Sequence, residues 1–181
     1  MSILEFNLYW MAYNISLAVI AVVCGWLALK VKRTAYRLPL LILWLLYIPN
    51  TLYLLSDSIH FSQQLSKIQD ADKISLITQY VVLMLFGVIS FVAGVYPIEK
   101  LIKKTHAVVM LQFVIAFGIV MGRVERTHSW EVFIDPIKVL QDAITVLTSI
   151  ELMFFVFVTG VFSNLIYFLL KPLFLRYVVR K

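Results

Sequence analysis

Five long apolar runs constrain this chain more than any other feature of its sequence. They cover residues 8–29, 38–55, 74–98, 107–122 and 143–170. A helix needs about 20 residues to cross the hydrocarbon core of a bilayer, and each run reaches or approaches that length. The runs are continuous, whereas the strands of a membrane barrel alternate apolar and polar residues. The sequence therefore predicts an all-α, polytopic membrane bundle of five transmembrane helices, with residues 1–181 forming a single integral membrane domain.

The composition agrees with a lipid environment. Hydrophobic residues make up 62% of the 181 residues, charged residues make up 14%, and the mean hydropathy is +0.92. A soluble domain of this size has too little interior to bury so much apolar surface, so the lipid bilayer is the expected surrounding. Cys24 is the single cysteine, which excludes an intramolecular disulfide and a CxxC motif. The first ten residues lack a basic region and a cleavage site, so we expect a retained first span.

The basic residues predict how the helices are oriented. They fall in short clusters between the apolar runs, a pattern that sets membrane orientation and does not call for a nucleic acid partner. On one side are Lys30, Lys32, Arg33, Arg37, Lys100, Lys103, Lys104, Lys171, Arg176, Arg180 and Lys181, and on the other side are Lys67, Lys73, Arg123, Arg126 and Lys138. The positive-inside rule then places the N-terminus outside and the C-terminus in the cytoplasm.

The two longer outer connections carry apolar residues of their own. Phe61, Leu65 and Ile68 recur at helical spacing, which predicts a short amphipathic helix lying on the membrane surface. Asp135 and Pro136 predict an N-cap and a first-turn proline that lead into the last transmembrane helix.

A first polar motif interrupts the second apolar run. Residues 46–60 read LYIPNTLYLLSDSIH, and in one continuous helix Asn50, Tyr53, Asp57 and His60 would share a narrow stripe. Pro49 removes a backbone hydrogen bond, so we expect the outer part of this helix to bend. Asn50 could satisfy backbone groups that the proline leaves without partners, or bond to a neighbouring helix.

A second polar motif, GRVERTHSWEVFIDP, covers residues 122–136 on the same predicted side. Arg123 and Arg126 are three residues apart, a spacing that in an α-helix could present two guanidinium groups to one anion. Gly118 and Gly122 form a GxxxG pair, which allows another helix to approach closely. Glu151 is predicted to lie about two turns inside the last span, with Arg123 as its partner.

The two motifs together predict a polar pocket that opens outward. Its candidate ligand-binding residues are Asn50, Tyr53, Asp57, His60, Arg123, Arg126, Ser129, Trp130, Glu131 and Glu151. No catalytic residue and no cofactor follows from this pattern.

Both motifs resemble a bacterial family of integral membrane proteins, domain of unknown function thirteen sixty-one. That family has PNxxY, then an aspartate and a histidine three residues later, and downstream GRxxRxNSWD and a proline. The matching residues are Pro49, Asn50, Tyr53, Asp57 and His60, then Gly122, Arg123, Arg126, Ser129, Trp130 and Pro136. The chain departs at His128, where the family usually has Asn, and at Glu131, where it usually has Asp. The resemblance implies a small multi-pass helical bundle in a bacterial plasma membrane, and it implies no activity.

Three functions remain open, and the sequence favours the first. The protein could be a non-enzymatic binding or transport-associated component whose pocket holds an anionic group such as a lipid phosphate. It could be a metal-assisted membrane enzyme in which Asp57, His60, His128 and Glu131 supply oxygen and nitrogen ligands. It could also be a structural or assembly subunit whose polar stripe locks the helices together while one surface docks onto a membrane protein partner.

Overall fold

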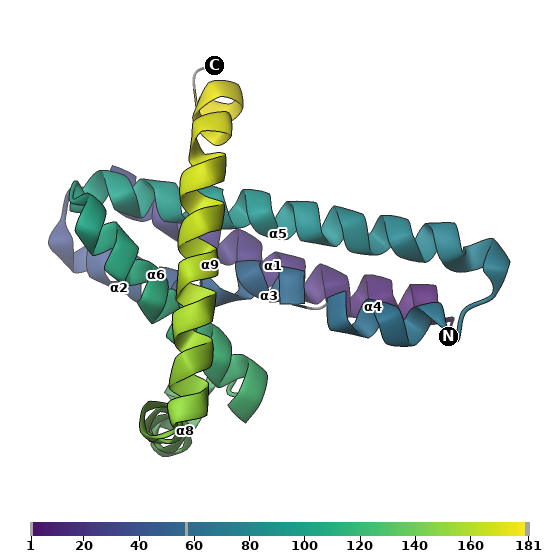
Figure 1. Ribbon diagram of the computed structural model, residues 1–181. Helices are drawn as coiled ribbons and strands as arrows, with labels where there is room; N and C mark the ends of the chain where they lie inside the picture. Colours follow the sequence, from purple (N-terminus) through teal and green to yellow (C-terminus); the bar gives the residue numbers. More distant parts are fainter. Residues whose placement is uncertain (1, 57, 180–181) are drawn as a thin grey trace.

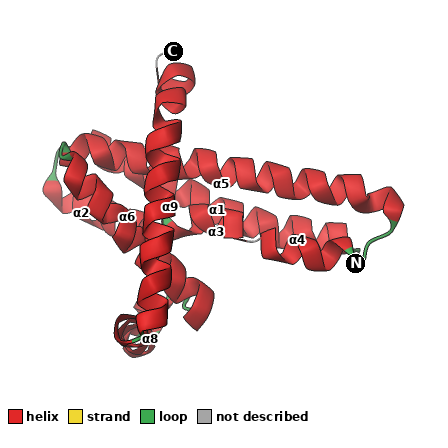
Figure 2. Ribbon diagram, in the orientation of Figure 1, coloured by secondary structure: helices red, strands yellow, loops and turns green. Residues whose placement is uncertain are grey.

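The computed structural model describes residues 2–56 and 58–179, and in this part of the chain all regular structure is helical (Figures 1 and 2). The α-helices are α1 (Ile3–Lys30), α2 (Thr34–Tyr47), α3 (Pro49–Ser56), α4 (Ser58–Leu65), α5 (Lys73–Ile102), α6 (Thr105–Val120), α7 (Glu131–Ile134), α8 (Pro136–Thr148) and α9 (Ile150–Phe174). Three short turns of other helix types complete the fold: η1 (Asp70–Asp72), η2 (Met121–Glu125) and η3 (Leu175–Val179).

Five helical segments are long and apolar enough to cross a membrane, as predicted. They are Ile3–Lys30, Thr34–Leu55, Asp70–Ile102, Thr105–Glu125 and Ile150–Tyr177. The first begins before the apolar run because Ser2 and Glu5 form a capping box, in which each side chain bonds to the backbone of the other residue. The apolar pattern therefore located the spans, whereas capping chemistry set this helix boundary.

The second span is broken where a bend was expected. Helix α2 ends at Tyr47 and α3 begins at Pro49, so Ile48 separates the two helices. Proline has no N–H group and its ring crowds the preceding turn, which explains the break. Helices α3 and α4 are described on either side of residue 57, which lies outside the described residues. The predicted stripe includes Asp57 and therefore stays a prediction.

The last span begins later than predicted. Asp135 caps α8, accepting a hydrogen bond from the Lys138 N–H at 3.1 Å, and Pro136 is the first residue of that helix. However, α8 ends at Thr148, and Ser149 is extended and caps α9 by accepting from the Leu152 N–H at 3.3 Å. The capping signal was correct but belongs to α8, so the predicted start of the last span at residue 143 was wrong.

The spans pack as two connected groups. Helix α1 lies along α5 and α2, with α3 contacting both α1 and α5, while α6 pairs with α9. Figure 1 shows α9 crossing α5 steeply, with the C-terminus at the far end of α9. The shared core includes Ile48, Phe91, Val95, Ile115 and Tyr167, all fully buried.

The lipid-facing surface is apolar, as a membrane bundle requires. Large side chains along α9, including Phe154, Phe155 and Phe157, are more than half exposed. In water such a continuous apolar surface would cause association, whereas lipid tails accommodate it.

Helix α4 forms where an amphipathic helix was predicted, but its apolar side chains point into the protein. Phe61 and Leu65 pack against the cluster that contains Tyr80, and the Phe61 and Tyr80 rings meet edge to face at 5.3 Å. The amide of Gln64 donates to Asn7 at 2.9 Å, and Asn7 donates back at 2.7 Å. The helix is therefore held by α1 and α5, and its position at the membrane surface stays a prediction.

Candidate functional site

The two polar motifs meet at the break between α2 and α3. The Ser129 hydroxyl donates to the Leu46 carbonyl at 2.8 Å, and the Asn50 amide donates to the Tyr47 carbonyl at 3.1 Å and to the Ser129 oxygen at 3.4 Å. These carbonyls belong to the last turn of α2, where helix termination leaves acceptors without helical partners. The predicted role of Asn50 in satisfying backbone near Pro49 is thereby confirmed.

Tyr53 lies against the two glycines of the GxxxG pair. Its hydroxyl donates to the carbonyls of Ile119 at 3.0 Å and Gly118 at 3.3 Å. A Cβ atom at Gly122 would collide with the Tyr53 hydroxyl, and one at Gly118 would lie 2.9 Å from the Pro49 ring. The glycines therefore allow α3 to approach α6 closely, in agreement with the sequence prediction.

The arginine pair does not lie on a regular α-helix. Residues Met121–Glu125 form a π-helical turn, and Arg126 ends it in the left-handed conformation, with φ of 56°. The α-helical spacing that would put Arg123 and Arg126 on one face therefore does not apply. Arg123 is half-buried with its guanidinium carbon 5.9 Å from the centre of the Tyr53 ring, whereas Arg126 is exposed.

The segment after the arginines is fixed by its own polar contacts. The Thr127 hydroxyl donates to Asp142 on α8 at 2.6 Å. Glu131 accepts from the His128 N–H at 2.8 Å and from Lys138 at 2.8 and 2.9 Å. The hydrogen bonds from Lys138 and then from His128 lower the pKa of Glu131, and the bond to Glu131 raises the pKa of Lys138. Glu131 is thus a carboxylate that orders the loop.

Two rings extend from this segment toward α1. The His128 ring stacks on Trp130 with centres 4.4 Å apart and planes inclined by 7°. Trp130 in turn meets the Tyr13 ring edge to face at 6.3 Å. The second motif therefore contacts α1 as well as α2 and α3.

A polar pocket of about 200 Å³ lies between these elements. Its lining is Tyr13, Asn14 and Leu17 from α1, Asn50 and Tyr53 from α3, and Gly122, Arg123, Thr127, His128, Ser129 and Trp130 from the second motif. Hydroxyl, amide and indole groups line this pocket together with Arg123, so the pocket combines hydrogen-bonding groups with positive charge. Such a lining suits an anionic group.

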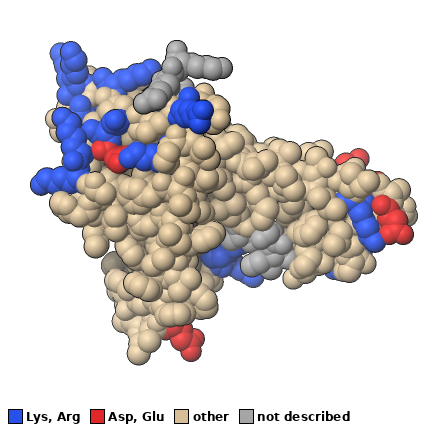
Figure 3. All heavy atoms as spheres, turned by 45° about the horizontal axis from the view of Figure 1, so that its top comes forward, with Lys and Arg blue, Asp and Glu red and all other residues tan. Residues whose placement is uncertain are grey.

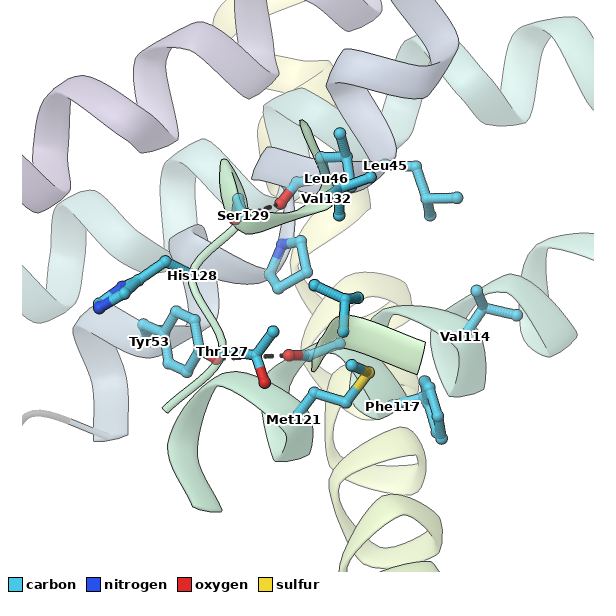
Figure 4. A pocket seen from close by; sticks show the side chains of 13 residues that line it. Leu45, Leu46, Tyr53, Val114, Phe117, Met121, Thr127, His128, Ser129 and Val132 are labelled. Carbon is cyan, nitrogen blue, oxygen red and sulfur yellow. Dashed lines mark hydrogen bonds between the residues drawn. The ribbon is translucent and has the colours of Figure 1, made fainter. Parts of the chain in front are cut away.

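An apolar pocket of about 210 Å³ adjoins the polar one (Figure 4). The two pockets share four lining residues: Tyr53, Thr127, His128 and Ser129. The apolar lining of the 210 Å³ pocket includes Leu45, Val114, Phe117 and Met121. Figure 4 shows the Ser129 hydroxyl bonded to the Leu46 carbonyl at its edge.

A larger apolar groove of about 640 Å³ is also lined by Arg123. Its lining consists of Arg123, Leu52 and Leu55 of α3, Met84 of α5, Ile119 and Val120 of α6, Val124 of the π-turn, and Phe155, Thr159 and Phe162 of α9. Arg123 is therefore shared by a polar pocket and a groove with an almost wholly apolar lining.

His60 and Glu151, two further candidate residues, do not line the polar pocket. Asp57 lies outside the described residues. His60 is exposed on α4, with its ring 6.5 Å from that of Trp10 on α1. Glu151 was expected about two turns inside the last span, but it is exposed in the first turn of α9, because the span begins at Ile150. A carboxylate there interacts favourably with the helix N-terminus.

Several residues of the site were not predicted from the sequence. Tyr13 looked like one more residue of an apolar run, Thr127 lay within the second motif but was not among the candidate residues, and Lys138 was counted only among the basic residues of one side. The spacing of Glu131 and Lys138, seven residues apart, gave no signal because the chain turns at Asp135 between them.

The described residues contain no group of three or more His, Cys, Asp or Glu side chains placed to hold a metal. Of the metal-ligand candidates, Glu131 is paired with Lys138 and His128 is stacked on Trp130. The described part of the site thus offers hydrogen-bond donors and a guanidinium group, which fit an anion better than a cation.

The helices and their apolar surface define the chain as a multi-pass membrane protein. Residues 13–165 match the family described as "Protein of unknown function (DUF1361)", and the chain belongs to this family, as its motifs suggested. The matched range spans both motif segments and all residues that line the polar pocket. No curated protein and no solved structure matches the chain.

Proposed function

We propose that this protein is a lipid-binding component of the membrane without chemistry of its own, and that its outward-facing site holds an anionic phospholipid. Arg123 and the polar pocket would bind the phosphate-containing headgroup, and the apolar groove would take an acyl chain. In this proposal the N-terminus faces outward and the C-terminus faces the cytoplasm across a bacterial plasma membrane, in agreement with the distribution of basic residues.

The position of Arg123 carries the proposal. The same side chain lines both the polar pocket and the apolar groove. A phospholipid also joins an anionic group to a long apolar chain at one point, so its two parts would meet the protein where its two linings meet. An arginine near the end of a span suits this place, because guanidinium groups bind phosphate through several N–H donors.

The other polar groups support binding of a headgroup. Asn50 and Ser129 are fixed by bonds to the end of α2, and the ring of Trp130 is fixed between His128 and Tyr13. Such pre-positioned groups lose little entropy when a ligand binds. Tryptophan is also favoured at the level of lipid headgroups.

Native mass spectrometry of the detergent-purified protein, titrated with phosphatidylglycerol or phosphatidylcholine, tests the proposal. Arg123→Gln should weaken phosphatidylglycerol binding by about tenfold, the equivalent of about 1.4 kcal/mol. Arg126→Gln is the matched control, because it removes the same charge from an exposed side chain, and it should leave this binding event unchanged.

A second pair of variants tests the groove without altering the arginine. Thr159→Trp should fill the groove and weaken lipid binding, whereas Leu165→Trp introduces the same ring at an exposed position on α9 and should have no effect. Equal binding by all four variants would contradict the proposal. Lower melting temperatures with unchanged lipid binding would instead indicate a structural or assembly role.

A further inference from the structure

Another pocket lies at the basic end of the bundle, at the opposite end of α6 from Arg123. Its volume is about 350 Å³, and its lining is Glu99, Lys100, Lys103, Lys104, Thr105 and Lys171. The lysines come from three places in the chain: the end of α5, the turn before α6 and the end of α9. Figure 3 shows Lys and Arg side chains gathered at this end around an acidic side chain.

The acidic residue in this pocket is already engaged. Glu99 accepts a hydrogen bond from the buried Tyr167 hydroxyl at 2.6 Å and pairs with Lys171 at 2.6 Å. Lys100 lies over the Tyr96 ring, 5.2 Å from its centre. One carboxylate among four lysines leaves the pocket strongly positive.

The start of α6 adds to the positive potential. Thr105 is the first residue of the helix, and the side chain of Lys104 at the N-cap position makes no capping hydrogen bond. The first N–H groups of a helix and its dipole favour an anion near the N-terminus. Ammonium groups and a helix N-terminus therefore converge on the same pocket.

In the turn between α5 and α6, Lys103 occupies a backbone conformation that favours glycine. Lys103 ends α5 in the left-handed conformation, with φ of 59°. Glycine adopts this conformation freely, whereas a residue with a Cβ atom is strained there. Lys103 and Lys104 alone form the turn between α5 and α6, because α5 ends at Ile102 and α6 begins at Thr105.

We propose that this basic pocket binds a phosphate group. The pocket lies at the ends of membrane spans, where lipid phosphates are found, and basic pockets between transmembrane helices on the cytoplasmic side bind anionic headgroups. The phosphate could belong to an anionic lipid or to a soluble phosphate compound. Neither source depends on the outward-facing site, so the two proposals stand or fall separately.

Phosphatidylglycerol titration in native mass spectrometry separates the two sites. Lys103→Gln combined with Lys104→Gln should remove one lipid-binding event, weakening it about tenfold or more, and should keep the event that Arg123→Gln removes. The matched control combines Lys30→Gln with Lys32→Gln, which removes two positive charges from the same end of the bundle outside the pocket.

Stabilisation by pyrophosphate tests whether the bound phosphate belongs to a soluble compound. In a neutral detergent without added lipid, pyrophosphate should raise the melting temperature of the wild type and not that of the Lys103/Lys104 double variant. Lipid binding that depends on Lys103 and Lys104 supports a headgroup, and stabilisation by pyrophosphate alone supports a soluble phosphate compound. If neither ligand distinguishes the double variant from its matched control, the proposal is overturned.

Discussion

The hydroxyl group of Tyr53 lies in the space that a side chain at Gly122 would occupy. The tyrosine belongs to the first polar motif and the glycine begins the second, so this contact fixes the distance between the two walls of the polar pocket. The Tyr53 hydroxyl also bonds to the carbonyls of Gly118 and Ile119, which makes its position specific.

Gly122→Ala should destabilise the protein by about 1–3 kcal/mol, because the new methyl group displaces the Tyr53 ring. Tyr53→Phe alone should cost about 1 kcal/mol through the lost hydrogen bonds. When Tyr53→Phe is added to Gly122→Ala, it should cause little further loss of stability, because the new methyl group has already displaced the Tyr53 hydroxyl. Unfolding in detergent measures the cycle, and strictly additive effects would show that the two residues are not coupled.

Ser129→Ala should lower the free energy of unfolding by about 1 kcal/mol, because the Leu46 carbonyl loses its donor and Asn50 loses an acceptor. Ser66→Ala is the matched control, since that exposed hydroxyl bonds to the Gln63 carbonyl three residues earlier in the chain. The same unfolding measurement compares them. Equal stability of the two variants would argue against a role for Ser129 in joining the motifs.

Acidic pH should release the segment around Glu131. Because the pKa of Glu131 in the folded protein lies below its ordinary value of 4.5, its pair with Lys138 stabilises the fold above pH 4.5 and is lost as the pH falls through the lowered pKa. Hydrogen exchange of residues 127–138, corrected for intrinsic rates, should show protection falling with pH. Glu131→Gln should have low protection throughout, and a wild type that shows no such loss contradicts the pairing.

Tyr167→Phe should cost about 1.5–3 kcal/mol, because the buried hydroxyl donates to the charged Glu99 carboxylate. Tyr177→Phe alters an exposed ring and should be nearly neutral. Thermal unfolding of both variants in the same detergent checks this expectation. Similar melting temperatures would mean that the hydroxyl of Tyr167 contributes little.

Apolar run length was enough to predict the five spans, because lipid selects for continuous hydrophobicity. Chain breaks were harder to predict. The break at Pro49 could be predicted because proline cannot donate a backbone hydrogen bond. The break at Ser149 depends on a single small polar residue inside an apolar region. Serine is also common within membrane helices, so the sequence around Ser149 does not predict a break there.

The site was predicted only in part, for a physical reason. Asn50, Tyr53, Arg123, Ser129 and Trp130 do line one pocket, because the motifs named the groups that form it. The larger apolar groove could not be predicted, since most of its lining consists of ordinary apolar residues from α3, α5, α6 and α9. Regular helical spacing also failed at Arg126, where a π-turn changes the direction of the chain.

The most direct test of the lipid-binding proposal is photo-crosslinking with phosphatidylglycerol that carries a diazirine near the end of one acyl chain. We predict that the crosslinks concentrate on groove residues such as Leu55, Thr159 and Phe162, and that Arg123→Gln removes them. Crosslinks spread evenly over lipid-facing positions such as Leu165 and Leu169, and unchanged in Arg123→Gln, would contradict the proposal.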